Sequence, residues 1–175
     1  MVLNTRADAA IDSIAPAPPA APNAEHSLIL RFLEETPWAN DLEQRQLEMM
    51  ARHMRVMYAD TDVRIFTEGD RDHFLAIVAD GKIDIVKEDS HRGHHVVVSL
   101  NRGKTFGELS LMDGGPRSST AIAKTYSTLL ILDEDSFDDL EDAHPAIAAK
   151  ILRVLARLLS QRLRMTSGRL VDHLQ

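Results

Sequence analysis

Short apolar segments alternate with turn signals through the middle of the chain. They cover residues 56–59, 63–67, 74–79, 83–86, 96–100, 120–125 and 129–132. The breaks between them contain glycine beside charged or polar residues, as in Glu68-Gly69-Asp70 and Asp80-Gly81-Lys82. Many short strands at regular spacing are typical of an antiparallel sandwich or barrel. We therefore predict a β domain between residues 56 and 132.

Helical periodicity flanks this β region on both sides. Ser27 is a candidate N-cap for a helix that Pro37 ends, and Asp41 is one for a second helix to about residue 54. An acidic segment, 133–142, predicts a short helix. Pro145 suits the first turn of a long helix that runs to about Arg164 or Leu170. The predicted fold class is therefore α+β.

The first 24 residues are rich in alanine and proline, which predicts a flexible tail before a single domain at 25–175. The formal net charge of −7 argues against nucleic acid as the main partner. The chain has no cysteine, so disulfides and thiolate chemistry are excluded. Without an apolar run long enough for a membrane span or a signal peptide, a cytoplasmic protein is the simplest interpretation.

The segment 106–121, FGELSLMDGGPRSSTA, concentrates the candidate chemistry. Gly107 allows a close backbone approach, and residues 108–112 can form one helical turn whose free N–H groups suit an anion. A Gly-Gly-Pro turn then leads to Arg117, whose guanidinium suits a phosphate, and to the hydroxyl of Ser118. Together with the carboxylate of Glu108, this set would satisfy a sugar hydroxyl and a phosphate held close together.

This segment resembles the phosphate-binding cassette of cyclic nucleotide-binding domains, the family of kinase regulatory subunits, gated channels and catabolite activators. The resemblance covers roughly residues 38–165 and implies a jelly-roll-like β-roll with a C-terminal lid helix. It gives Glu108 the ribose 2′-hydroxyl and Arg117 the cyclic phosphate, with kinase-like spacing between them. The ligand-binding residues that it implies are Phe106, Gly107, Glu108, Leu109, Arg117, Ser118 and Ser119.

The family's lid helix contacts the base, and two alternatives remain for this chain. Thr166 and Ser167 resemble the base-reading pair of catabolite-activator-like members, in which the helix also forms a parallel dimer interface. Kinase-like spacing instead favours Gln161 or Arg162. A homodimer through the 147–170 helix is a weaker implication, because its apolar stripe can also pack on the β-roll.

The resemblance implies a stand-alone receptor for cAMP, or for cGMP, that signals to a partner protein by moving its helices. The chain ends at Gln175 without a helix-turn-helix segment, and we expect neither an enzyme nor a cofactor. His91, His94 and His95 do not predict a metal site, because adjacent strand residues point to opposite faces. The alternatives are a cyclic di-GMP effector using Arg153, Arg157 and Arg164, and a ligand-independent interaction module.

Overall fold

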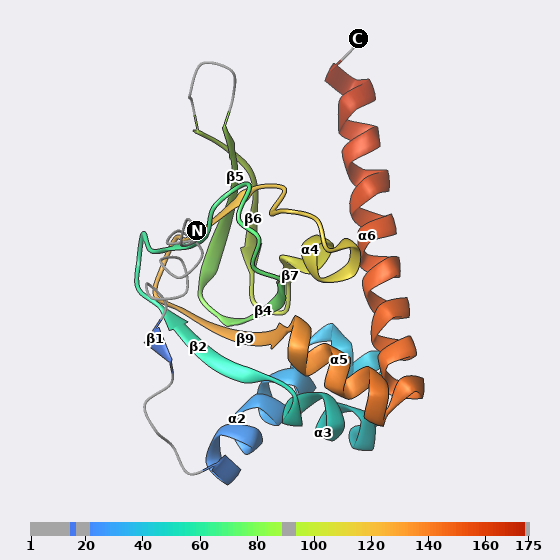
Figure 1. The fold of residues 1–175 in the computed structure, drawn as a ribbon. Coiled ribbons are helices and arrows are strands. Elements are labelled where there is room, and N and C mark those ends of the chain that lie inside the picture. The colour runs from blue at the N-terminus through green and yellow to red at the C-terminus, as the bar shows by residue number, and fades with distance from the viewer. Residues whose placement is uncertain (1–14, 17–21, 89–93, 174–175) are drawn as a thin grey trace, which may run out of the picture.

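The computed structural model describes residues 15–16, 22–88 and 94–173. Two antiparallel sheets form a β-roll, and helices cover one of them (Figure 1). The first sheet has the order β1-β2-β9-β4-β7, and its strands are β1 Ala15–Pro16, β2 Arg55–Ala59, β9 Ser127–Asp133, β4 Phe74–Asp80 and β7 Thr105–Phe106. The second has the order β3-β8-β5-β6, and its strands are β3 Arg64–Phe66, β8 Thr120–Ala123, β5 Lys82–Glu88 and β6 His94–Asn101. The predicted α+β class and β-roll are confirmed.

The central strands β4 and β9 are buried on both faces. Alternate residues of each strand point to opposite sides of the sheet. Phe74, Ala76 and Val78 of β4 pack into the interior of the roll. Leu75 and Ile77, between them, pack into a second core under the helices. This double burial explains why these strands have continuous apolar runs.

The helices pack on the outer face of the first sheet (Figure 1). They are α2 Pro22–Glu34, the 3-10 helix η1 Pro37–Asn40, α3 Gln44–Arg52, α5 Glu134–Ala143 and α6 Pro145–His173. The remaining helix, α4 Glu108–Asp113, lies between β7 and β8 in the chain. Figure 1 shows α6 rising from the other helices and passing beside α4. Its first half is anchored in the helical core through Ile151 and Leu155, which are fully buried.

Several predicted helix ends differ from the structure. The first helix begins at Pro22 and not at Ser27, so the predicted domain boundary at residue 24 falls inside α2. Asp41 does not cap the second helix, because the 3-10 turn places it at the end of η1; Glu43 is the N-cap instead. Pro145 does begin the long helix, as predicted. The flexible tail stays a prediction, since most of it lies outside the described residues.

Two findings about absent features apply to the described residues alone. No group of three or more histidines, cysteines or carboxylates there could hold a metal ion; His91 lies outside these residues, and His94 and His95 lie on β6. None of the helices in the described ranges is both long and apolar enough to cross a membrane.

Candidate ligand-binding site

The short helix α4 begins and ends at glycines with positive φ. Gly107, the N-cap residue, has φ 77°, and Gly114 at the other end has φ 63°. A Cβ atom on Gly107 would lie 2.7 Å from the carbonyl oxygen of Phe74 and 2.7 Å from Nη1 of Arg117. The groups that crowd Gly107 here are the Arg117 guanidinium and the Phe74 carbonyl. The close approach of a ligand to Gly107 stays a prediction.

The segment 106–121, which contains both Glu108 and Arg117, is called the Glu–Arg turn, or the turn, from here on. Arg117 is buried in it, with only 1% of its side chain exposed. Its Nε and Nη2 donate to the two carboxylate oxygens of Asp72, each over 3.1 Å. Nη1 donates to the carbonyl oxygens of Phe74 and Gly107 and to the hydroxyl of Ser110, over 3.0, 2.8 and 2.7 Å. Burial lowers the pKa of Arg117, and the hydrogen bond and charge of Asp72 oppose this shift. The guanidinium thus holds β4, α4 and the 67–72 loop together.

Two aromatic rings, which pack edge to face against each other, both contact this guanidinium. The Cζ atom of Arg117 is 4.1 Å from the ring centroid of Phe66 and 4.1 Å from that of Phe74. Cation–π attraction is strongest where the cation is desolvated, as it is here. Backbone bonds add to the arrangement: the Arg117 N–H donates to the Asp70 carbonyl over 2.8 Å, and the Gly69 N–H donates to the Arg117 carbonyl over 2.9 Å.

Glu108 opens α4 and is the second buried charge of the turn, with 4% of its side chain exposed. Its Oε1 accepts a hydrogen bond from Nη1 of Arg162, which reaches over from α6. Nη2 of Arg162 also donates to the carbonyl oxygen of Thr105 and, over 2.9 Å, to the Thr105 hydroxyl. The other carboxylate oxygen of Glu108, Oε2, is buried and has no hydrogen-bond partner among the described residues. A buried acceptor without a partner is costly, so a donor from a ligand would be favourable there.

The structure brings some of the predicted residues together and leaves others apart. Phe106 is buried in the interior of the roll, against Phe66. Leu109 is exposed on α4, whereas Ser118 is exposed and Ser119 half-buried on the segment leading to β8. Of the predicted lid residues, Arg162 reaches the turn, while Gln161, Thr166 and Ser167 are exposed. The ligand contacts assigned to all of these residues stay predictions.

Sequence reasoning missed the residues that hold the two charges in place. They are Phe66, Asp72, Phe74, Thr105 and Ser110. Ser110 lies inside the singled-out segment, and its position on the first turn of α4 is the signal that could have found it. Asp72 belongs to an acidic loop, 68–72, in which no local pattern separates it from Glu68 or Asp70.

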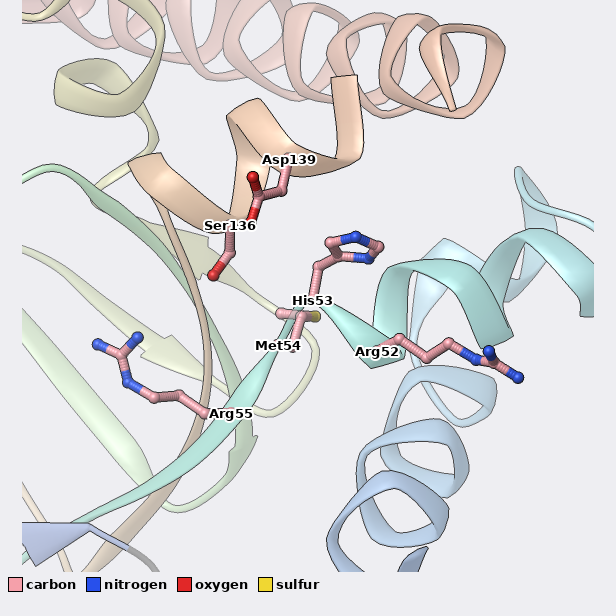
Figure 2. A pocket seen from close by; sticks show the side chains of 6 residues that line it. All are labelled: Arg52, His53, Met54, Arg55, Ser136 and Asp139. Carbon is pink, nitrogen blue, oxygen red and sulfur yellow. The ribbon is translucent and has the colours of Figure 1, made fainter. Parts of the chain in front are cut away.

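A pocket that does not include Glu108 or Arg117 lies where α3, β2 and α5 meet (Figure 2). It is lined by Arg52, His53, Met54, Arg55, Ser136 and Asp139. Arg55 is already paired with Asp133, and His53 contacts the carbonyl oxygen of Met49 through Nδ1 over 2.8 Å. None of the residues that form the turn around Glu108 and Arg117 lines this pocket, so the pocket is separate from the candidate site.

The fold and the turn together define a β-roll domain with a buried Glu–Arg turn beside a long C-terminal helix. The family model of the cyclic nucleotide-binding domain matches residues 58–144, which include β4, β9 and the whole turn. The chain therefore belongs to the cyclic nucleotide-binding domain family. The resemblance seen in the 106–121 segment is confirmed.

Two relatives are regulators. The chain is 33% identical over 108 residues to a CRP-like cAMP-activated global transcriptional regulator of Mycobacterium tuberculosis, covering 62% of this chain and 46% of that protein. It is 31% identical over 109 residues to the cAMP-dependent protein kinase regulatory subunit of Schizosaccharomyces pombe, covering 62% of this chain and 26% of that one. The alignments thus span less than half of either relative.

A solved structure extends the similarity to most of the chain. A cyclic nucleotide-binding domain from Methylobacillus flagellatus superposes with a TM-score of 0.78, covering 92% of this chain and 89% of that one. Its sequence identity of 23% supports the shared fold alone.

Proposed function

We propose that this protein is a receptor for cAMP, or for cGMP, and that it acts as a regulator and not as a catalyst. The observation that carries the proposal is the buried, unpartnered Oε2 of Glu108. A ribose 2′-hydroxyl is a neutral donor of the kind that this oxygen lacks. Both relatives described above have cAMP in their printed names, which favours cAMP over cGMP.

Arg117 is the proposed phosphate contact, although internal partners hold most of its donors. Nη2 carries two N–H groups, and the described residues provide one acceptor for it, Asp72. We propose that the remaining N–H donates to a phosphate oxygen. The phosphate would then join Asp72 in neutralising a guanidinium that is otherwise desolvated.

The output of the receptor is proposed to be a change in the position of α6 and the N-terminal helices, which a partner protein detects. A ligand shifts such an equilibrium only if it binds one arrangement better than the other.

Leu163 and Met165 on the distal part of α6 are 69% and 60% exposed, which supports a homodimer through this helix. Sedimentation of a Leu163→Glu variant tests this, and an unchanged mass would count against the dimer.

The cyclic di-GMP alternative receives less support. Of the three arginines it would use, Arg157 is paired with Asp41, and Arg164 donates to Ser160 within its own helix. All three arginines are exposed on α6. The interaction-module alternative is weakened because Glu108 and Arg117 are both retained and both buried.

Calorimetric titration with cAMP, cGMP and cyclic di-GMP tests the proposal, using Glu108→Gln as the informative variant. We expect one cyclic mononucleotide to bind and Glu108→Gln to weaken it by about 1.5–3 kcal/mol, or roughly ten- to a hundredfold. Asp113→Asn is the matched control, because it makes the same chemical change on the exposed end of α4. No heat with any of the nucleotides, on folded wild-type protein, would reject the receptor and favour the interaction module.

A further inference from the structure

At one end of the first sheet, the two-residue strand β1 covers the edge of β2. On its inner side, β2 pairs with β9 over its whole length without a register shift. On its outer side, the described residues give it β1 alone, with Ala15 opposite Tyr58 and Pro16 opposite Met57 (Figure 1). The edge is thus closed by a part of the N-terminal segment, which lies outside the Glu–Arg turn.

The strand β2 has little protection of its own against pairing with another chain. Lysine, proline, a bulge or very short length usually protects the edge of a sheet. β2 is five residues long with the sequence RVMYA, and its one charged residue, Arg55, is paired with Asp133. Val56 packs in the helical core and Met57 in the interior of the roll, so both faces of the strand are held in place. Without β1, the backbone groups on the outer side of β2 would be open to a second strand.

The outer strands at the other ends of the two described sheets do have such protection. β7, at the opposite end of the first sheet, is two residues long. β3 is three residues long, and its pairing with β8 shifts register between Arg64 and Phe66. β6 is longer, but its pairing with β5 shifts register between Ile85 and Val86, and a bulge of this kind twists an edge away from a flat partner. In the described sheets, β2 is therefore the position where another segment has to block regular strand pairing.

The strand β1 is suited to closing this edge without creating a new one. Proline has no backbone N–H, so Ala15 is the one residue of β1 that can donate a backbone hydrogen bond. The sequence continues with Pro18 and Pro19, which lack this donor as well. A two-residue strand followed by prolines offers little to a further strand, so the sheet ends at β1.

We propose that the segment around Ala15 and Pro16 is an intramolecular edge cap, whose docking on β2 prevents a second copy of this chain from pairing with the same edge. Two copies of β2 can pair antiparallel about a two-fold axis at Met57, the symmetry that most homodimers use. In that register each Arg55 lies opposite Ala59, so like charges do not oppose the pairing. The cap competes well because it belongs to the same chain, which gives it a high effective concentration. This inference does not depend on the proposed ligand.

Disulfide trapping tests the docking of the cap, since the chain has no cysteine of its own. Ala15→Cys and Tyr58→Cys are combined in one full-length chain. Opposed residues of antiparallel strands lie about 4.5–5.5 Å apart between Cα atoms, which is within disulfide reach. Under mild oxidation we expect a crosslink within one chain, and a much slower one in the matched control, Ala10→Cys with Tyr58→Cys, because Ala10 lies outside β1. Equal rates for the two pairs, or crosslinks mainly between two chains, would overturn the proposal.

Sedimentation tests what the cap prevents. Ala15→Pro removes the N–H donor of β1, and Ala10→Pro is the same substitution outside it; both are made in the Leu163→Glu chain, so that pairing through α6 does not contribute. As concentration rises, we expect Ala15→Pro to move from the mass of one chain toward that of two, and at low concentration to exchange the amides of residues 55–59 faster. Ala10→Pro is expected to match its parent in both. An Ala15→Pro chain that stays monomeric, or whose amide exchange is unchanged, contradicts the edge cap.

Discussion

Arg117 has two roles in this protein, one proposed and one structural. It is the proposed phosphate contact, and it is also a buried structural cation held by Asp72 and by two aromatic rings. Guanidinium groups suit this position because their planar fork can bond to a carboxylate and stack on aromatic faces at once. A loss of ligand binding in an Arg117 variant therefore has to be separated from a loss of folding.

Replacing Arg117 by alanine is expected to lower the free energy of unfolding by about 3–5 kcal/mol, because it leaves Asp72 buried without its partner. The Asp72 side chain is only 11% exposed, so water compensates little of the loss. Urea unfolding of Arg117→Ala, Asp72→Ala and the double variant measures the coupling. The double variant should lose less than the sum of the single losses, whereas additive losses would contradict the pairing.

At the scale of elements, the turn depends on two glycines that both have a positive φ angle but differ in their surroundings. Gly107 is packed against β4 and the Arg117 side chain, while nothing lies within 4 Å of the position that a Cβ atom on Gly114 would take. Both require a left-handed backbone, which costs a residue with a side chain roughly 1–2 kcal/mol. The comparison of these two positions separates conformational strain from steric conflict.

Gly114→Ala is therefore expected to destabilise the protein by about 1 kcal/mol, from the backbone term alone. Gly107→Ala should cost clearly more, because its Cβ would collide with the backbone oxygen of Phe74, which cannot move away as a side chain would. It should also weaken nucleotide binding by shifting Glu108. Thermal unfolding and calorimetry of the two variants check this, and equal losses would refute the steric argument.

At the scale of the whole molecule, one sheet serves two cores. The inner face of the first sheet closes the β-roll, and its outer face carries the helices, including the first half of α6. The two halves of α6 differ in what they contact. The first belongs to the helical core, and the second extends past α4, where Arg162 joins it to the turn (Figure 1). The movement of α6 that we propose for the receptor therefore concerns its distal half.

Substitutions along α6 should show this division. Leu155 is fully buried, so Leu155→Ala is expected to lower the free energy of unfolding of the domain by about 2–5 kcal/mol. Leu163 is 69% exposed, and Leu163→Ala is expected to change it by less than about 0.5 kcal/mol. Chemical denaturation at low protein concentration distinguishes them. A large loss in Leu163→Ala would show that the distal half is part of the folded core.

Local sequence was sufficient for the features that depend on neighbouring residues. Apolar runs placed the strands, since β4 and β9 are buried on both faces, and Pro145 marked the start of α6. The glycines, Glu108 and Arg117 lie within one short segment, so the turn was predictable from its own residues. Helix starts were less predictable, because the 3-10 turn at 37–40 displaced the cap from Asp41 to Glu43.

Tertiary structure alone decided the partners of the two buried charges. Asp72 is 45 residues from Arg117, and Arg162 is 54 residues from Glu108. Each charged side chain could have been satisfied by any of several residues, and periodicity carries no information on which of them packing brings within reach. The sequence by itself therefore determined where the Glu–Arg turn is and which family it belongs to. The fold determined that Arg117 is held by Asp72 and that Glu108 is joined to α6, because burial leaves those charges stable only beside these partners.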